Sequence, residues 1–176
     1  TDAALALGFI HVMVKEDLIN TEFIEKWTNS PFLVRTDGEC PVLLKESDLK
    51  KDGSKTNFIA HDPVSDSTIV WDTEKQAYDR YGLKPSMEGE FNISLTDGSK
   101  IKAKTVWTVY KENVEQYTPE KVSKITWVPA DKIQKAARMY AKSKPSALHW
   151  GLPIDTIPST IPTSQAINHL WCLTGN

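Results

Sequence analysis

The spacing of apolar residues predicts helices at both ends of the chain and short strands between them. Residues 3–14 form the most apolar stretch, and with Thr1 or Asp2 as the N-cap they predict a helix that runs to about Ile19. A second, short helix is expected at residues 22–27. Because the first helix is apolar on nearly every side, it should be covered on more than one face.

Polar, turn-rich sequence follows from Asn29 to about Lys104, with brief strand-like runs inside it. These runs are residues 32–36, 67–72, 91–95 and 101–107. The Asp-Gly dipeptide at 97–98 separates two runs in which apolar residues alternate, a pattern typical of a β-hairpin. The Lys- and Asp-rich tract at 45–57 is typical of a solvated loop. Together these features predict a β-rich insertion over residues 29–103.

Helix start signals return after the insertion. Residues 118–120, Thr-Pro-Glu, supply a capping residue, a proline at the first helical position and an acid in the first turn. Residues 129–131 repeat this pattern, and Pro145 ends the helix that they start. The apolar positions of that helix recur on one face, at Ile133, Ala136, Ala137 and Tyr140. The apolar run at 146–150 then predicts a strand, followed by a loop at 151–163 and a final helix.

The order helix, strand, loop, helix predicts an α/β fold. We expect a Rossmann-like three-layer α/β/α core built from residues 1–28 and 104–176, with the β-rich insertion between them. In open α/β sheets, ligands bind where loops follow the carboxyl ends of the strands, and residues 151–163 occupy that place. This loop is longer than the roughly two to six residues that are usual. A ligand-shaped loop and a plain structural connection both fit the pattern.

Composition narrows the class of protein. The chain has 176 residues, 40% of them hydrophobic, which is enough for one core. The net charge of -2 arises from 21 basic and 23 acidic residues spread along the chain, and this balance counts against a nucleic-acid partner. Cys40 and Cys172 lie in no metal-binding or disulfide pattern, so a reducing cytoplasm fits best.

Membrane and export signals are not evident in these residues. As a helix, residues 3–14 span about 18 Å, short of a bilayer core of about 30 Å. Asp2 stands where a signal peptide would carry a basic residue. An export signal could still lie on a longer parent chain.

Candidate chemistry in the sequence is sparse. Neither the glycine-rich dinucleotide fingerprint nor the P-loop motif is present. His11 lies in an apolar helix and is expected to be a satisfied core histidine, and Cys172 is expected to pack against neighbours. His149 and His169 flank the predicted loop, but we assign them no acid–base role. No catalytic residue and no set of metal ligands is therefore predicted.

Three stretches together resemble the catalytic subunits of the dimethyl sulfoxide reductase superfamily, the molybdopterin-dependent oxidoreductases. Residues 1–29 resemble the family's Gly-Thr-Asp helix that follows a strand, without its glycine. Residues 117–151 are similar to a helix pair and strand of the same domain, and residues 167–176 resemble its closing helix with Leu-Thr-Gly-Asn. Within the superfamily, Trp-Gly-Leu-x-x-Asp at 150–155 is most similar to acetylene hydratase and to catechol dehydroxylases and transhydroxylases.

This resemblance implies that the chain contacts one end of a molybdopterin guanine dinucleotide, which carries molybdenum or tungsten in the full-length enzyme. The implied cofactor contacts are Thr1, Asp2, Trp150, Gly151, Leu152, Asp155 and Thr156. Each of these residues also has a purely structural interpretation, as a helix cap, a strand end or a polar loop residue. The resemblance places no catalytic residue and no metal ligand in this chain.

The resemblance also implies that the chain is the middle domain of a longer catalytic subunit and is inactive alone. An iron–sulfur cluster is then expected in a missing N-terminal region, and the partners are the other domains of the subunit and an iron–sulfur electron-transfer subunit. The expected location is cytoplasmic, or periplasmic if the full-length chain carries an export signal. A stand-alone nucleotide-binding module and a non-catalytic interaction domain remain the alternatives.

Overall fold

The chain forms two compact units. The computed structural model describes residues 1–149 and 151–176, apart from the side chains of Pro153 and Asp155. One unit combines residues 1–27 with 111–176, and the other comprises residues 28–110.

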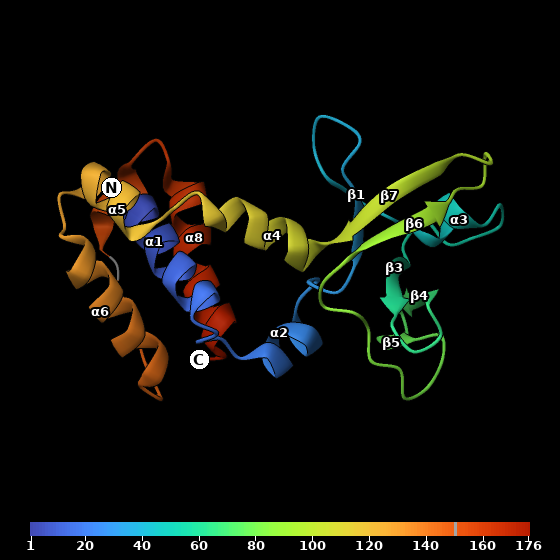
Figure 1. Cartoon of the computed structure of the whole chain (residues 1–176), viewed down its shortest axis with the longest axis horizontal. Coiled ribbons are helices and arrows are strands. Elements are labelled where there is room, and N and C mark those ends of the chain that lie inside the picture. The colour runs from blue at the N-terminus through green and yellow to red at the C-terminus, as the bar shows by residue number, and fades with distance from the viewer. Residues whose placement is uncertain (150) are drawn as a thin grey trace. The chain divides into compact units, whose positions relative to one another are not determined.

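In the unit of residues 1–27 and 111–176, the regular elements of the described residues are all helices (Figure 1). Its helices are α1 (Asp2–Lys15), α2 (Thr21–Trp27), α5 (Pro119–Thr126), α6 (Ala130–Lys142), α7 (Leu152–Thr156) and α8 (Thr160–Thr174), together with the second half of α4 (Val106–Glu115). Helix α1 is the central element, because α5, α6 and α8 all pack against it. Its residues Ile10 and Met13 are 0% exposed, which confirms the prediction that this helix is covered on more than one face.

The unit of residues 28–110 contains all of the described strands, and every strand pair in it is antiparallel. Its elements are β1 (Leu33–Arg35), β2 (Val42–Leu43), α3 (Glu46–Leu49), β3 (Phe58–Asp62), β4 (Ser67–Asp72), β5 (Ala77–Tyr78), β6 (Glu90–Ser94) and β7 (Lys100–Thr105). One sheet has the order β2-β1-β7-β6 and the other the order β3-β4-β5. Their shared core consists of Leu33, Leu44, Ile59, Val70, Ile93 and Ala103.

Several predicted elements are confirmed. The Asp-Gly turn at 97–98 joins β6 to β7 in the expected hairpin. Thr118 caps α5, since its hydroxyl accepts a hydrogen bond from the amide of Lys121 at 3.3 Å. The general prediction of an α/β chain that mixes helices and strands is also confirmed.

The predicted strand at 146–150 is wrong for its described residues, 146–149, which form no strand. A strand needs a neighbour for its backbone groups, and the amide of Ser146 instead donates to the side-chain Oδ1 of Asn176 at 3.3 Å. The Rossmann-like three-layer arrangement is therefore not confirmed, and helices pack directly on α1 in this unit. Trp150, the last residue of the predicted strand, lies outside the described residues.

Three smaller predictions also need correction. The first helix ends at Lys15, because Asp17 adopts a left-handed backbone with φ of 53°. The predicted loop at 151–163 is mostly helical, since α7 and the start of α8 occupy it. The tract at 45–57 contains the short helix α3, whose N-cap residue Lys45 donates its amide to the carboxylate of Asp48. None of the described helices is long and apolar enough to cross a membrane.

Candidate functional site

The first turn of α1 lacks a side-chain cap. Thr1 is the N-cap residue, but its side chain makes no capping hydrogen bond, so the side-chain cap expected from the sequence is not formed. Only the carbonyl of Thr1 takes part in the helix, accepting from the amide of Leu5 at 3.0 Å. The first amides of a helix carry a partial positive charge and have no partner within the helix. They can therefore donate to an anion or a carbonyl oxygen.

A hollow of about 240 Å³ lies beside this turn. Its lining residues come from α1, from the segment before α7, from α7 itself and from α8: Asp2, Leu5, Ala6, Phe9, Leu148, His149, Ile154, Ile167 and Leu170. The walls are mainly aliphatic, and among the described lining residues Asp2 and His149 carry titratable groups. A whole ligand pocket usually measures at least about 300 Å³, so this hollow fits one part of a ligand.

Of the predicted cofactor contacts, Asp2 is the one that lines the hollow among the described residues. Asp2 lines the hollow together with Ile154, which lies inside the predicted stretch 150–156. Leu152, 72% exposed, is not among the lining residues, nor is the exposed Thr1. Trp150 lies outside the described residues.

The other predicted contacts have structural roles that the sequence did not indicate. Gly151 is the exposed N-cap residue of α7, with an extended φ of -121°. The hydroxyl of Thr156 donates to the carbonyl of Leu152 at 3.3 Å, within the same short helix. The side chain of Asp155 lies outside what the structure describes.

Sequence reasoning missed the aliphatic walls of the hollow. Asp2, Leu5, Ala6 and Phe9 follow the spacing i, i+3, i+4, i+7, which places them on one face of α1. That signal was present, but α1 is apolar on nearly all sides and the spacing did not single out this face. His149 also lines the hollow, whereas His169 is not among its lining residues. Desolvation lowers the pKa of His169 below its usual value.

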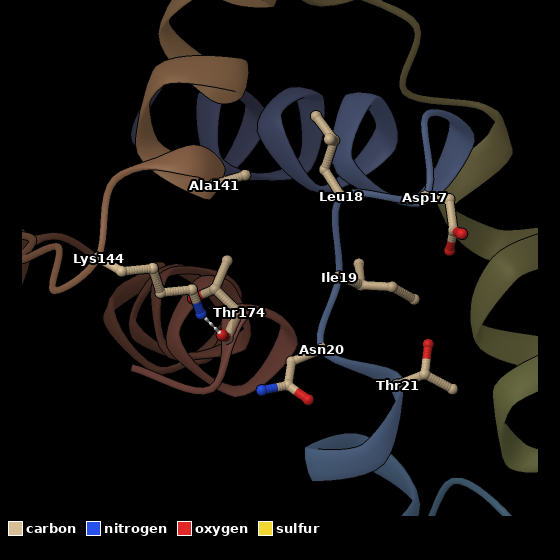
Figure 2. A pocket seen from close by; sticks show the side chains of 8 residues that line it. All are labelled: Asp17, Leu18, Ile19, Asn20, Thr21, Ala141, Lys144 and Thr174. Atoms are coloured by element: carbon tan, nitrogen blue, oxygen red, sulfur yellow. Dashed lines mark hydrogen bonds between the residues drawn. The ribbon is translucent and has the colours of Figure 1, made fainter.

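A second hollow, of about 390 Å³, lies near the opposite end of α1 (Figure 2). Its lining residues are Asp17, Leu18, Ile19, Asn20, Thr21, Ala141, Lys144 and Thr174. In Figure 2 the Lys144 ammonium reaches the carbonyl of Thr174, to which it donates a hydrogen bond. Because carbonyl groups at helix C-termini carry partial negative charge, this lysine stabilises the end of α8. We therefore interpret this hollow as part of the helix packing.

A polar chain in the other unit also has a structural interpretation. The imidazole of His61 contacts the hydroxyl of Ser86 at 3.3 Å through Nδ1 and the carboxylate of Asp66 at 3.1 Å through Nε2. The residue types match those of a nucleophile, a base and an orienting acid. However, His61 is only 6% exposed, and its ring stacks on Phe91 at 3.8 Å. The buried ring fastens two segments to β3 and is not presented to a substrate.

Metal binding is not supported by the residues that the structure describes. No group of three or more His, Cys, Asp or Glu side chains among them could hold a metal ion. Cys40 and Cys172 are both exposed, so the expectation that Cys172 packs against neighbours is wrong. It lies on the open side of α8, while its neighbours Leu170 and Leu173 face the core. His11 is half-buried, and its Nδ1 lies 3.1 Å from the carbonyl oxygen of Val114, as expected for a satisfied histidine.

Comparison with known proteins identifies relatives of one kind. Dopamine dehydroxylase of Eggerthella lenta is 28% identical over 254 residues, which cover all of this chain and 25% of that protein. Perchlorate reductase subunit alpha of Dechloromonas aromatica is 33% identical over 175 residues, covering 86% of this chain and 19% of the relative. Formate dehydrogenase H of Escherichia coli is 43% identical over 67 residues, which cover 38% of this chain and 9% of the relative.

The chain is homologous to the molybdopterin oxidoreductases of the dimethyl sulfoxide reductase family. The resemblance found in the sequence is thus confirmed at the level of the family. No family model matches the chain. The chain spans about a quarter or less of the length of these relatives, so the activity of the whole protein is a separate question.

Proposed function

We propose that residues 1–27 and 111–176 are a cofactor-binding part of the catalytic subunit of a molybdopterin oxidoreductase. In this proposal the hollow beside the first turn of α1 takes the guanosine end of one molybdopterin guanine dinucleotide. The observation that carries the proposal is the position of Asp2 in an aliphatic hollow that also includes Ile154. Asp2 and Ile154 come from residues 1–2 and 150–156, the two segments in which the resemblance implies cofactor contacts.

The chemistry of the hollow suits a guanine base. Guanine presents an N–H and an amino group side by side, and a carboxylate such as Asp2 can accept both hydrogen bonds. The aliphatic side chains of Leu5 and Leu170 offer flat apolar contact to a purine ring. A volume of about 240 Å³ suits the base alone, so the rest of the dinucleotide would extend to the neighbouring amides of α1 and to residues 151–156.

The metal of the cofactor would be held elsewhere. Molybdenum or tungsten supplies the redox chemistry when it is bound, and the residues of this chain would bind and orient one end of its organic ligand. The described residues contain no cluster of metal ligands, so we expect the isolated chain to hold no metal and to turn over no substrate. Elemental analysis that finds stoichiometric molybdenum, tungsten or iron in the purified chain would contradict this expectation.

Guanosine diphosphate binding tests the site directly. We expect guanosine diphosphate to shift the amide NMR signals of residues 1–6 and 148–156. Millimolar ligand is needed, because in this proposal other domains complete the site and the chain alone should bind weakly. Asp2→Asn should abolish the preference for guanosine over adenosine diphosphate, since an amide cannot accept both guanine donors. Asp17→Asn, at the other end of α1, is the matched control and should bind like the parent chain.

Two further variants test the segment before and within α7. Gly151→Val adds a branched side chain at the N-cap of α7, and Asp155→Ala removes the acid that the family resemblance places near the cofactor. Both should weaken binding while the helical circular dichroism is unchanged. Shifts confined to residues 28–110 would show that the hollow is not a nucleotide site. So would affinities of Asp2→Asn, Gly151→Val and Asp155→Ala that all equal the affinity of the control Asp17→Asn.

The proposal extends to the full-length enzyme. We propose that the other domains of the catalytic subunit complete the site, that an iron–sulfur cluster lies in one of them, and that an iron–sulfur subunit delivers or removes electrons. The proposed location is the cytoplasm, or the periplasm if an export signal is present. Sequencing of the gene on both sides tests this: a stand-alone nucleotide-binding module or interaction domain would lack an upstream cysteine cluster and a downstream pterin domain.

A further inference from the structure

Among the strands that the structure describes, β6 pairs on one side only. The sheet order β2-β1-β7-β6 places it at the edge, paired with β7 through the hairpin turn (Figure 1). An edge strand presents a row of backbone N–H and C=O groups that can pair with another extended chain. Folded proteins usually protect such edges with charge, proline or a bulge.

The register shows which backbone groups of β6 point away from β7. The amide of Thr105 donates to the carbonyl of Gly89 at 3.2 Å, and the amide of Leu95 donates to the carbonyl of Ser99 at 2.9 Å. Hydrogen-bonded and non-hydrogen-bonded pairs alternate along an antiparallel ladder. The odd-numbered residues of β6 therefore bond to β7, while the even-numbered residues, with Asn92 at the centre, direct their backbone groups to the open side.

A groove of about 370 Å³ runs beside this open edge. Its lining residues are Leu49, Lys50, Thr68, Asn92, Ile93 and Ser94. Two of the six, Leu49 and Ile93, are aliphatic members of the core region or its border. The groove thus combines open backbone groups with an apolar contact, which is what an added strand requires. At one end, the amide of Thr96 donates to the carbonyl of Asp48 at 2.9 Å and closes the edge.

The face of the hairpin next to the edge is basic. Strand β7 carries lysines at positions 100, 102 and 104, and the register pairs them with Ser94, Asn92 and Glu90 of β6. Glu90 is the one carboxylate of β6 and bonds the ammonium of Lys102 at 2.7 Å. Cross-strand partners share one face of a sheet, so on this face the side chains of β6 and β7 supply three ammonium groups and one carboxylate. A strand added beside β6 would lie two strand spacings, about 10 Å, from β7. The lysine side chains are long enough to extend over β6 toward it, as that of Lys102 already does in reaching Glu90.

We propose that β6 is a docking edge for an extended segment of another polypeptide that carries carboxylates at alternate positions. The segment would add as a fifth strand to the sheet β2-β1-β7-β6, exchanging backbone hydrogen bonds with Asn92 and its even-numbered neighbours. Its carboxylates would lie on the lysine face, and its intervening apolar side chains would contact Leu49 and Ile93. This surface lies in the unit of residues 28–110 and is independent of the nucleotide site proposed above.

A capped synthetic peptide that alternates valine and glutamate is the probe. Binding to the chain should slow hydrogen exchange of the Asn92 and Ser94 amides and leave the amides of Phe91 and Ile93, already bonded to β7, unchanged. A peptide that alternates valine and lysine should bind at least about tenfold more weakly, because its charges face Lys100 and Lys102. The valine–glutamate peptide with N-methylated backbone should not bind, since it cannot form the ladder.

Variants of β6 and β7 provide the matching test on the protein side. Asn92→Pro removes the central open amide, and proline is tolerated on an edge strand where the N–H faces away from the sheet. It should weaken peptide binding by at least about tenfold, whereas Asn92→Ala, which keeps the amide, should bind nearly like the parent chain. Lys100→Glu should weaken binding and leave the fold unchanged.

Three outcomes would overturn the proposal. The first is equal binding of the normal and N-methylated peptides, which would mean that no strand is added. The second is unaltered affinity of Lys100→Glu, which would remove the charge argument. The third is concentration-dependent dimerisation of the chain that Asn92→Pro abolishes, which would make a second copy of this chain the occupant of the edge. If Asn92→Pro proves unfolded, the N-methylated peptide still decides the first outcome.

Discussion

Gly8 of α1 packs directly against Val122 of α5. A Cβ atom at Gly8 would lie 3.1 Å from Cγ1 and 3.2 Å from Cγ2 of Val122, closer than side chains normally approach. Val122 is 0% exposed, so it lies in the close-packed interior, where side chains have little room to shift. The absence of a side chain at Gly8 therefore sets the distance between the two helices, and with it the position of the helix that carries Asp2.

Gly8→Ala should lower stability even though alanine favours helices. The gain in helix propensity is about 1 kcal/mol, but overpacking of a buried site typically costs about 1–3 kcal/mol. We expect a net loss of about 1 kcal/mol in urea unfolding followed by circular dichroism. Gly38→Ala is the control, because a Cβ there meets only the carbonyl of Cys40 at 3.9 Å. An unchanged or raised unfolding midpoint for Gly8→Ala would contradict the close packing.

An ion pair links the end of α1 to α6 and should make stability depend on pH. The guanidinium of Arg138 donates to both carboxylate oxygens of Glu16, at 2.8 and 2.7 Å, and this bonding holds the pKa of Glu16 below its usual value of 4.5. A lowered folded-state pKa means that the stabilisation is present above pH 4.5 and is lost as the pH falls through the folded value.

Glu16→Gln should therefore lower the urea midpoint at neutral pH and have no effect once the carboxylate is protonated in both states. The loss should be small, because the side chains of Glu16 and Arg138 are 37% and 43% exposed and water screens the pair. Comparing unfolding at neutral and strongly acidic pH checks the sign. A larger effect of the substitution in acid than at neutral pH would rule out this account.

Local signals in the sequence were sufficient for many elements. The cap at Thr118 needs only residues within one helical turn, and the hairpin at 97–98 needs only its own turn and flanking alternation. For the same reason the buried face of α6 followed from periodicity, with Ile133 and Ala137 both 0% exposed. Such elements are predictable because their hydrogen bonds close over a few residues.

The predicted strand at 146–150 failed because a strand depends on a partner that no local pattern reveals. The segment has suitable residues, but its described part bonds to Asn176, which is distant in the sequence. The hollow beside the first turn of α1 was predictable only in part for a similar reason. The resemblance singled out Asp2, whereas Leu148 and Ile167 enter the hollow through tertiary packing, which spacing alone does not show.

Tyr140 carries a buried hydroxyl that has no hydrogen-bond partner among the described residues. The residue is 8% exposed, so its hydroxyl is shielded from bulk solvent. An unsatisfied buried polar group costs about 1–3 kcal/mol. Tyr140→Phe should accordingly raise the free energy of unfolding by about 1 kcal/mol, whereas Tyr140→Leu should lower it through lost packing. A clear loss of stability in Tyr140→Phe would reveal a partner for the hydroxyl.

Gly175 ends α8 with φ of 67°, and a Cβ atom there would lie 2.7 Å from Nδ2 of Asn20. Gly175→Ala should cost about 2 kcal/mol, from left-handed strain and from this clash. In the parent chain, Oδ1 of Asn20 accepts a hydrogen bond from the amide of Phe23 and so caps α2. Asn20→Ser shortens this side chain, and serine can still cap the helix. In that background the cost of Gly175→Ala should fall to about 1 kcal/mol. An equal cost in both backgrounds would leave backbone strain as the sole cause.

His61 holds the segment around Ser86 onto β3, and its removal should loosen that segment locally. The backbone of Ser86 donates to the carbonyl of His61 at 2.8 Å, and the two side chains are 3.3 Å apart. His61→Ala removes the side-chain contact, the stack on Phe91 and the link to Asp66, so we expect a loss of about 2 kcal/mol. Hydrogen exchange should accelerate most at residues 84–88.

Asp66→Asn is the matched control for this prediction. The side chain of Asp66 is 94% exposed, so the pair that it forms with His61 is well screened and its loss should barely change stability or exchange. The contrast between His61→Ala and Asp66→Asn separates the effect of the buried contacts of the imidazole from the effect of its exposed contact with Asp66. Equal acceleration in both would mean that the exposed carboxylate, and not the stacked and buried ring, positions the segment. Acceleration spread evenly over residues 28–110 would instead mean that His61 supports the whole core of that unit.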